Sequence, residues 1–226
     1  MRAPVVLLIT LCGLLAGGVT PARAASFTVS LDTSALVGLG TFELDFQLVD
    51  GDGVADTTVI LRGFTFGGGS STGSPTLVGG ASGSLATELT LQDTAFFNRA
   101  AQAFTPGATL SFLLEVSGSS DPSSPDFFSV ALLDASGFEL PTLGFAEELL
   151  SLALVAGAAP ESFGTDPDRT DLNVPAPTVT AVPEPATALL VLSGALLASA
   201  RYRHGLRQWR RSASRGVSFG PSPRQP

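Results

Sequence analysis

The segment TFELDFQLV, Thr41–Val49, alternates between apolar and polar residues over its length. Because successive side chains of a strand point to opposite faces, its apolar residues would share one face and Glu43, Asp45 and Gln47 the other. This pattern predicts a strand with one buried and one solvated face, which is typical of antiparallel sheets. The buried face would hold Phe42, Leu44, Phe46 and Leu48.

Further strand patterns recur along the chain, separated by loops rich in Gly, Ser, Pro and Asp. The loops are expected at 67–83, 118–126 and 156–168. The strands are expected at Val59–Phe66 (interrupted by Gly63), Leu85–Leu91, Ala108–Val116, Phe127–Leu133 and Leu149–Val155.

Short strands at this spacing predict an all-β domain over residues 25–165. We expect an antiparallel β-sandwich of jelly-roll-like type, with fourteen of the fifteen Phe in its core. Two segments stay open. Ala95–Ala103 also suits one or two helical turns, and Glu147–Ala153 also suits a helix because of its Leu and Ala content.

Charge is distributed unevenly along the chain. The whole chain has a formal net charge of −8, but residues 25–182 carry three Arg against nineteen Asp and Glu, hence −16. The same span contains no Cys, His, Lys, Tyr, Trp or Met. It therefore offers no thiol nucleophile, imidazole base, Schiff-base amine or disulfide, and its charge opposes nucleic-acid binding. We expect no enzyme and no nucleic-acid partner.

Residues 1–24 have the three parts of a secretory signal peptide. Arg2 supplies a short positive region, Val5–Leu15 an apolar run, and Ala22 and Ala24 the small residues before a cleavage point. The run is shorter than the roughly 20 residues of a membrane-spanning helix. We expect export through the Sec translocon and cleavage by signal peptidase; a buried N-terminal helix is the alternative.

A second apolar segment lies near the other end of the chain. As a helix, residues 186–200 would be about 22 Å long, which is short for a hydrocarbon core of about 30 Å. Arginine snorkelling would make up part of the difference. We expect a single transmembrane helix there, with the acidic span outside by the positive-inside rule. The helix follows Pro183, Glu184 and Pro185 and precedes a basic stop cluster of Arg201, Arg203, Arg207, Arg210 and Arg211.

This arrangement resembles the PEP-CTERM sorting signal of Gram-negative bacteria over residues 183–211. The shared parts are the Pro-Glu-Pro motif, the short apolar helix and the basic cluster, in a chain that begins with a signal peptide. The resemblance implies an exosortase as partner, a membrane protease that would remove the helix and basic cluster. Residues 212–226 continue beyond the family's usual end and are expected to be a disordered tail. A membrane anchor without processing is the alternative.

Residues 166–182 are rich in Pro and Asp and poor in bulky apolar residues. This composition is typical of an extended linker. We expect the segment to hold the sandwich away from the membrane and to present the Pro-Glu-Pro motif.

The loop that follows the quoted strand, DGDGVAD, carries three carboxylates around two glycines. Asp50, Asp52 and Asp56 are hard oxygen donors on a Gly-rich turn, which suits Ca²⁺ as a cofactor. The loop is similar to part of an EF-hand-type or repeat-type calcium loop. Val54 stands where that loop has another Asp or Asn, and the closing Glu is missing. A β-turn with Asp-Gly chemistry is the alternative.

Two patterns point formally to catalysis. Gly69–Gly73 matches G-x-S-x-G, but a nucleophile elbow needs a His, so a Gly/Ser loop is the better interpretation. Glycosidase chemistry needs only two carboxylates, yet no pair stands out among nineteen. Trp and Tyr, the residues that most often grip sugars, are missing from the same span.

Three hypotheses for function follow. The first is a non-enzymatic exported protein of the cell surface or exopolysaccharide matrix, sorted by an exosortase from an inner-membrane-anchored precursor. The second is a calcium- or carbohydrate-binding surface module. The third is a hydrolase that uses carboxylates alone. Thermal stabilisation by calcium would separate the second hypothesis from the first.

Overall fold

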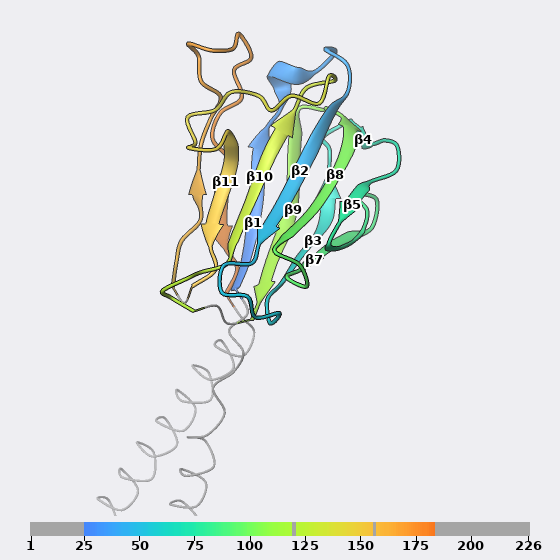
Figure 1. Ribbon diagram of the computed structural model, residues 1–226. Helices are drawn as coiled ribbons and strands as arrows, with labels where there is room; N and C mark the ends of the chain where they lie inside the picture. The colour runs from blue at the N-terminus through green and yellow to red at the C-terminus, as the bar shows by residue number, and fades with distance from the viewer. Residues whose placement is uncertain (1–24, 119–120, 156, 184–226) are drawn as a thin grey trace, which may run out of the picture. The chain divides into compact units, whose positions relative to one another are not determined.

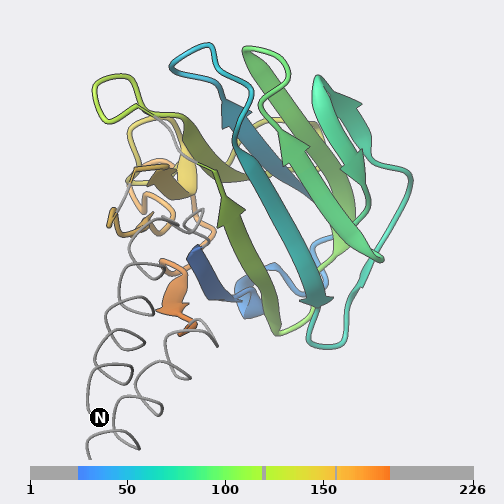
Figure 2. The same cartoon turned by 90° about the horizontal axis from the view of Figure 1, so that it is seen from below.

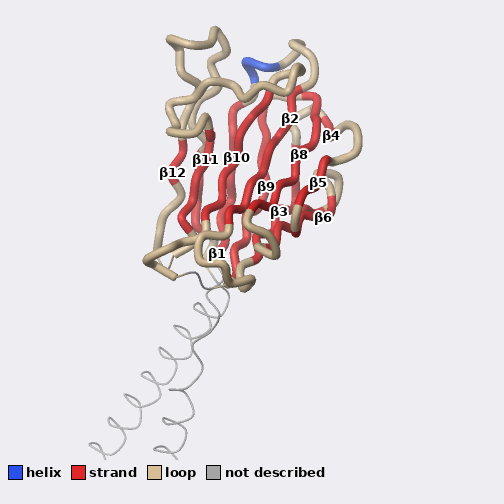
Figure 3. Tube along the Cα trace, in the orientation of Figure 1, coloured by secondary structure: helices blue, strands red, loops and turns tan. Residues whose placement is uncertain are grey.

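The computed structural model describes residues 25–118, 121–155 and 157–183 (Figure 1). The described residues up to Val182 belong to one compact unit. Within the described ranges the chain is almost entirely strand and loop, with one turn of 3₁₀ helix, η1 (Ser34–Leu36), as Figure 3 shows. The expected signal peptide, transmembrane helix and tail lie outside the described residues.

The first sheet has six strands, all paired antiparallel, in the order β13-β1-β9-β3-β7-β6. Its centre is β9, which pairs with β1 along one side and with β3 along the other. The strands span β1 (Ala25–Asp32), β3 (Thr58–Thr65), β6 (Gly80–Gly83), β7 (Glu88–Gln92), β9 (Thr109–Ser117) and β13 (Thr178–Ala181).

The second sheet follows the order β12-β11-β10-β2-β8-β4, with β5 also paired to β8, and is again antiparallel. The quoted segment forms its central strand, β2. The strands span β2 (Phe42–Val49), β4 (Ser70–Ser71), β5 (Thr76–Val78), β8 (Phe97–Thr105), β10 (Phe127–Leu133), β11 (Glu148–Ala153) and β12 (Glu161–Ser162).

The two sheets lie face to face and bury one apolar core, so the domain is a β-sandwich (Figure 1). Phe46 of the second sheet lies at its centre, with its ring centroid 5.9 Å from that of Phe112 and 6.0 Å from that of Phe64, both in the first sheet. The buried face predicted for β2 is confirmed, because Phe42, Leu44, Phe46 and Leu48 are all buried, but Asp45 of the face expected to be solvated is buried too.

Both open segments are strands. Ala95–Ala103 contributes to β8, whose alternate residues from Asn98 to Phe104 are buried, so a period of two prevails over the helical alternative. Glu147–Ala153 contributes to β11, which pairs with β10. Gly63, with φ 67°, falls where the register of β3 shifts against β9 between Arg62 and Thr65, so the expected interruption is a bulge.

Three predictions about loops and linkers are corrected. Residues 156–168, expected to be a loop, contain β12, which pairs with β11. Residues 67–83, expected to be a single loop, contain β4, β5 and β6, which pair with β8 and β7. The G-x-S-x-G pattern therefore lies on a short edge strand.

Residues 166–182, expected to be a linker, pack on the sandwich. Val174 is 1% exposed, and β13 pairs with β1 from Phe27↔Ala181 to Ser30↔Thr178. Without β13, the backbone of β1 would form an unpaired sheet edge.

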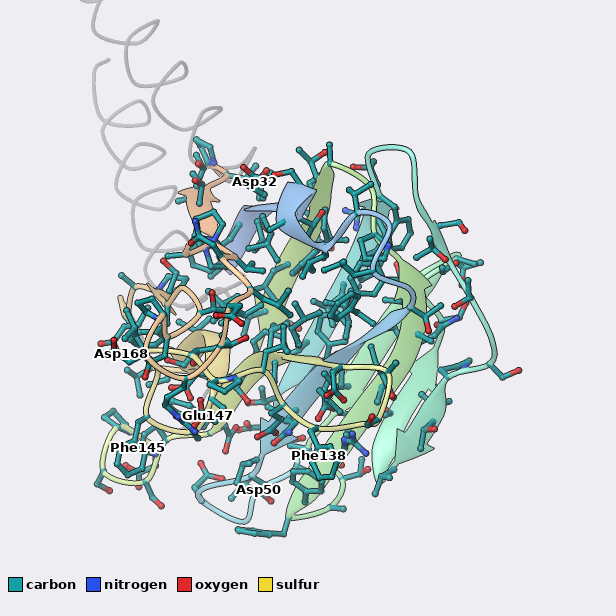
Figure 4. The ribbon with its side chains drawn as sticks, turned by 90° about the horizontal axis from the view of Figure 1, so that it is seen from above. Asp32, Asp50, Phe138, Phe145, Glu147 and Asp168 are labelled. Atoms are coloured by element: carbon teal, nitrogen blue, oxygen red, sulfur yellow. The ribbon has the colours of Figure 1, made fainter. Side chains whose placement is uncertain are left out.

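The prediction that the Phe residues of this span form the core is wrong for five of them. Phe145 is completely exposed, and Phe138 is 72% exposed; both lie in the loop between β10 and β11, and Figure 4 places Phe145 at the outer edge of the domain. The other exposed rings are Phe96, Phe97 and Phe127.

Candidate metal centre

Three loops meet at one end of the sandwich. The register pairs Val49, the last residue of β2, with Phe127, the first residue of β10, and Thr58 of β3 with Gln92 of β7. The connections that leave these strand ends are therefore neighbours: residues 50–57, residues 93–96, and the described part of the β9–β10 connection, residues 118 and 121–126. Figure 2 looks onto this end of the domain.

Five aspartates from these loops form two groups. Within each group, one carboxylate oxygen of every member lies within 4.8 Å of those of the others. The first group is Asp50, Asp52 and Asp126, and the second is Asp56, Asp93 and Asp126. Asp126 belongs to both. We call the five residues the acidic junction.

Asp126 is the buried centre of the acidic junction, with 0% of its surface exposed. Its Oδ1 accepts a hydrogen bond from the backbone N–H of Gly51 at 2.9 Å. Its Oδ2 is buried and accepts no hydrogen bond from the residues that the structure describes. Most buried polar atoms in proteins have a partner, so an unpaired oxygen on a buried residue that belongs to two carboxylate groups points to a cation.

Asp93 is the second buried member, at 2% exposure. Its Oδ2 accepts hydrogen bonds from the backbone N–H groups of Thr57 at 2.8 Å and Asp56 at 3.1 Å, which ties the end of β7 to the start of β3. Burial raises the pKa of Asp93, and the charge of Asp126 raises it further, against the lowering effect of the backbone donors. The raised pKa reflects mainly the cost of burying a charged carboxylate, to which the charge of Asp126 makes a smaller contribution.

The exposed side of the junction is shaped by turn hydrogen bonds. Asp50 Oδ1 accepts from Gly53 N at 2.6 Å, and Asp52 Oδ1 accepts from Val54 N at 2.8 Å. These bonds are those of the expected Asp-Gly turn. Asp52 Oδ2 accepts from Asp121 N at 3.0 Å, so the loop is also tied to residues 118–126. The turn and the cation interpretation are compatible, because the turn holds the carboxylates in place.

Gly51 allows the two loops to approach each other. A Cβ at this position would lie 2.1 Å from the carbonyl oxygen of Pro125, a distance that real contacts do not reach. The Ser124 hydroxyl also donates to the Gly51 carbonyl oxygen. The approach of Gly51 to the β9–β10 loop therefore brings Asp50 and Asp52 to Asp126.

The donor set is made of carboxylate oxygens alone, which suits a hard divalent cation. Ca²⁺ takes six to eight oxygen ligands in flexible geometry, and it accepts water at exposed positions. Mg²⁺ demands stricter octahedral geometry. The ligands of this cluster come from both buried strand ends and an exposed turn, so their geometry is irregular and fits Ca²⁺ better than Mg²⁺.

The structure divides the predicted set of Asp50, Asp52 and Asp56. The first two join Asp126, while Asp56 joins both Asp93 and Asp126. Sequence reasoning missed Asp93 and Asp126. The sequence holds a weak signal for both residues. Asp93 directly follows the strand β7, and Asp126 directly precedes the strand β10.

The sorting-motif residues are mostly outside the described ranges. Pro183 is described and exposed. The remaining motif residues, Glu184 and Pro185, and the arginines of the basic stop cluster lie outside, so their roles stay predictions.

Within residues 25–118, 121–155 and 157–183, no helix is long and apolar enough to cross a membrane. Compared with protein-family models, with curated proteins and with solved structures, the chain shows no match, so the argument for its function rests on its own residues.

Proposed function

We propose that the chain is a non-enzymatic exported protein of the cell surface or exopolysaccharide matrix, whose β-sandwich binds Ca²⁺ at the acidic junction. The observation that carries the calcium part is the buried Asp126, a member of both carboxylate groups, whose Oδ2 accepts no hydrogen bond from the described residues. Calcium would compensate the buried charge and join loops in a domain that has no Cys to join them.

The positive charges of the domain support this assignment. Its three arginines are each engaged with a carboxylate outside the junction: Arg62 with Glu115, Arg99 with Asp45 and Arg169 with Glu147. No Lys or His lies between residues 25 and 182. The charge of the junction is therefore left to a cation from solution.

The connections between the sheets support a jelly-roll-like interpretation of the sandwich, which we include in the proposal. The chain crosses from sheet to sheet along β1, β2 and β3, and again along β7, β8, β9 and β10. β9 returns between β1 and β3. Crossings of this kind are characteristic of jelly rolls.

Export and sorting are supported by the signals at the two ends of the sequence. The predicted order of events is cleavage after Ala24, anchoring through residues 186–200, and exosortase processing at the Pro-Glu-Pro motif. Mass spectrometry of the extracellular fraction should find a chain that begins near Ala25 and ends near the motif. Peptides that contain Trp209 or Phe219 in that fraction would contradict processing.

Calcium binding is tested by thermal unfolding of the protein purified from the producing cell. Calcium at millimolar concentration should raise the unfolding temperature in a saturable way, because a ligand of the folded state stabilises it by mass action. Asp52→Asn should reduce the rise. Sodium chloride is the control, since screening of a −16 domain stabilises without saturation at one site. Identical melting curves in calcium and in chelator would refute the proposal.

One observation favours carbohydrate binding as a second function. Phe97 and Phe127 lie directly opposite Val49 in the two neighbouring strands, on the outer face of the second sheet and beside the acidic junction. They are 37% and 41% exposed, and aromatic faces stack on sugar rings. In electrophoresis, a gel that contains polysaccharide from the producing cell should retard the wild type more than the variant with Phe97→Ala and Phe127→Ala. Equal mobility would count against this function.

A further inference from the structure

We infer that the acidic junction holds two non-equivalent Ca²⁺ ions that share Asp126: an inner ion that joins the two sheets, and an outer ion that holds the Asp50–Asp56 loop. This inference rests on the proposed calcium binding and goes beyond it in number, position and consequence.

The two groups of carboxylates differ in the strands that carry them. Asp50 and Asp52 directly follow β2, and Asp126 directly precedes β10, so every member of the first group adjoins a strand of the second sheet. Asp93 follows β7 and Asp56 precedes β3, both strands of the first sheet. Only the second group combines residues that adjoin strands of both sheets, because Asp126 adjoins β10.

The charge of the junction exceeds what one ion can balance. Five carboxylates carry a formal charge of −5. One bound Ca²⁺ would reduce the net charge to −3, and two would reduce it to −1. The arginines of the domain are engaged elsewhere. Carboxylates this close raise one another's free energy strongly where burial lowers the effective dielectric. Two ions therefore bring the cluster closest to neutrality.

Asp126 is suited to bridge the two ions. Gly51 N–H holds its Oδ1 from one side, and Oδ2 is buried without a hydrogen-bond donor among the described residues. A carboxylate has about four acceptor directions, of which Gly51 uses one. Bridging carboxylates hold pairs of cations about 3.5–4 Å apart in two-metal sites.

Burial makes the two sites unequal. The inner group contains both buried members, Asp93 and Asp126, which are held at strand ends by backbone hydrogen bonds, and one exposed member, Asp56. In the outer group, Asp50 and Asp52 are partly exposed residues of a turn. Electrostatic attraction is stronger in the less hydrated site, and its rigid ligands lose less entropy on binding. The inner ion should therefore bind more tightly, while the outer ion responds to the calcium concentration outside the cell.

Native mass spectrometry and calorimetric titration of the chelator-treated protein from the producing cell test this inference. The wild type should take up two Ca²⁺ per chain in two steps. Asp52→Asn should lose the weaker step, Asp93→Asn the tighter step, and Asp126→Asn should weaken both by more than tenfold. Asp168→Asn, an exposed carboxylate outside the junction, is the control of equal charge and should keep both steps.

The outcomes separate this inference from the proposed function. One ion in the wild type overturns the two-ion arrangement and leaves calcium binding intact, whereas no ion overturns both. Loss of the same step in Asp52→Asn and Asp93→Asn also overturns the arrangement. Circular dichroism checks that each variant is folded. Should Asp126→Asn fail to fold, the wild type and the two single-site variants still decide the number and position of the ions.

Discussion

Asp93 follows a strand of one sheet and Asp126 precedes a strand of the other, yet their carboxylate oxygens lie within 4.8 Å of each other in the interior of the loop junction. Two buried like charges at this distance repel each other, which backbone hydrogen bonds offset only in part and a cation between them would offset further. The end of the sandwich where they meet should therefore be the part of the domain that depends most on ionic conditions.

Asp126→Asn should stabilise the domain in chelator but destabilise it relative to the wild type in calcium. In chelator the amide removes a buried charge and can donate to a neighbouring carboxylate, so the variant should unfold at a higher temperature than the wild type. In saturating calcium the wild type gains about 2.7 kcal/mol at a concentration 100 times the dissociation constant, and the variant gains much less. Thermal unfolding of wild type and variant in both buffers shows whether the order of their unfolding temperatures reverses. A variant that is less stable in both buffers by the same amount would contradict a cation role for Asp126.

Gly51→Ala should separate the two loops that carry Asp50, Asp52 and Asp126. The new Cβ would meet the Pro125 carbonyl oxygen, so residues 50–52 must move away from Asp126. We expect calcium affinity to fall about tenfold or more, which corresponds to about 1.4 kcal/mol. Gly53→Ala is the matched control. A Cβ at Gly53 would meet nothing within 4 Å, so it would not move the loop towards or away from Pro125. The positive φ of 76° makes the substitution strained, so it costs stability all the same. Equal losses of affinity would show that loop strain, not the close approach, matters.

Arg99→Gln should destabilise the domain more than Arg62→Gln. Arg99 Nε donates at 2.7 Å to Asp45, whose side chain is only 2% exposed, so the substitution leaves a buried carboxylate with one partner fewer. We expect a loss of about 1.5–3 kcal/mol. Arg62 pairs with Glu115, and their side chains are 49% and 29% exposed, so that loss should be below about 1 kcal/mol. Urea unfolding of both variants gives the comparison, and the reverse order would contradict it.

Glu147 should contribute stability that is lost at acidic pH. The backbone N–H of Thr142 and the guanidinium of Arg169 hold the pKa of Glu147 below the ordinary value of 4.5. A lowered pKa stabilises the folded state above the unfolded-state value, and this contribution disappears as pH falls through the folded-state value. Glu147→Gln should therefore be less stable than the wild type at pH 7. The two should converge below pH 4.5, as chemical unfolding across pH can measure. A difference that grows on acidification would have the wrong sign.

Phe46→Ala and Phe145→Ser should differ sharply in their effect on unfolding. Phe46 is fully buried between the sheets, so its truncation should cost about 3–5 kcal/mol. Phe145 is fully exposed, and its substitution should stay within about 0.5 kcal/mol. Denaturant unfolding gives both values. A large loss for Phe145→Ser would show that its ring packs on the domain in solution.

Local pattern was sufficient for the strands of the core. The alternation of TFELDFQLV predicted the inward residues of β2 correctly, because a half-buried strand must alternate with a period of two. The same pattern placed Asp45 on a solvated face, whereas it is 2% exposed. Asp45 lies between Ala101 and Ala131 in the neighbouring strands, and Arg99 pairs with it. Burial of an outward residue depends on what covers the sheet, which periodicity does not encode.

The sequence by itself determined the all-β class, the position of the first carboxylates and the absence of thiol and imidazole chemistry from residues 25–182. It also supplied the sorting expectations, which rest on segments outside the described residues. Only the tertiary structure decided that Asp56 faces Asp93, that Asp126 joins both groups, and that residues 178–181 complete the edge of the first sheet. The physical reason is sequence separation. Asp50 and Asp126 are far apart along the chain, and they meet because antiparallel pairing of β2 with β10 brings the end of one strand to the start of the other.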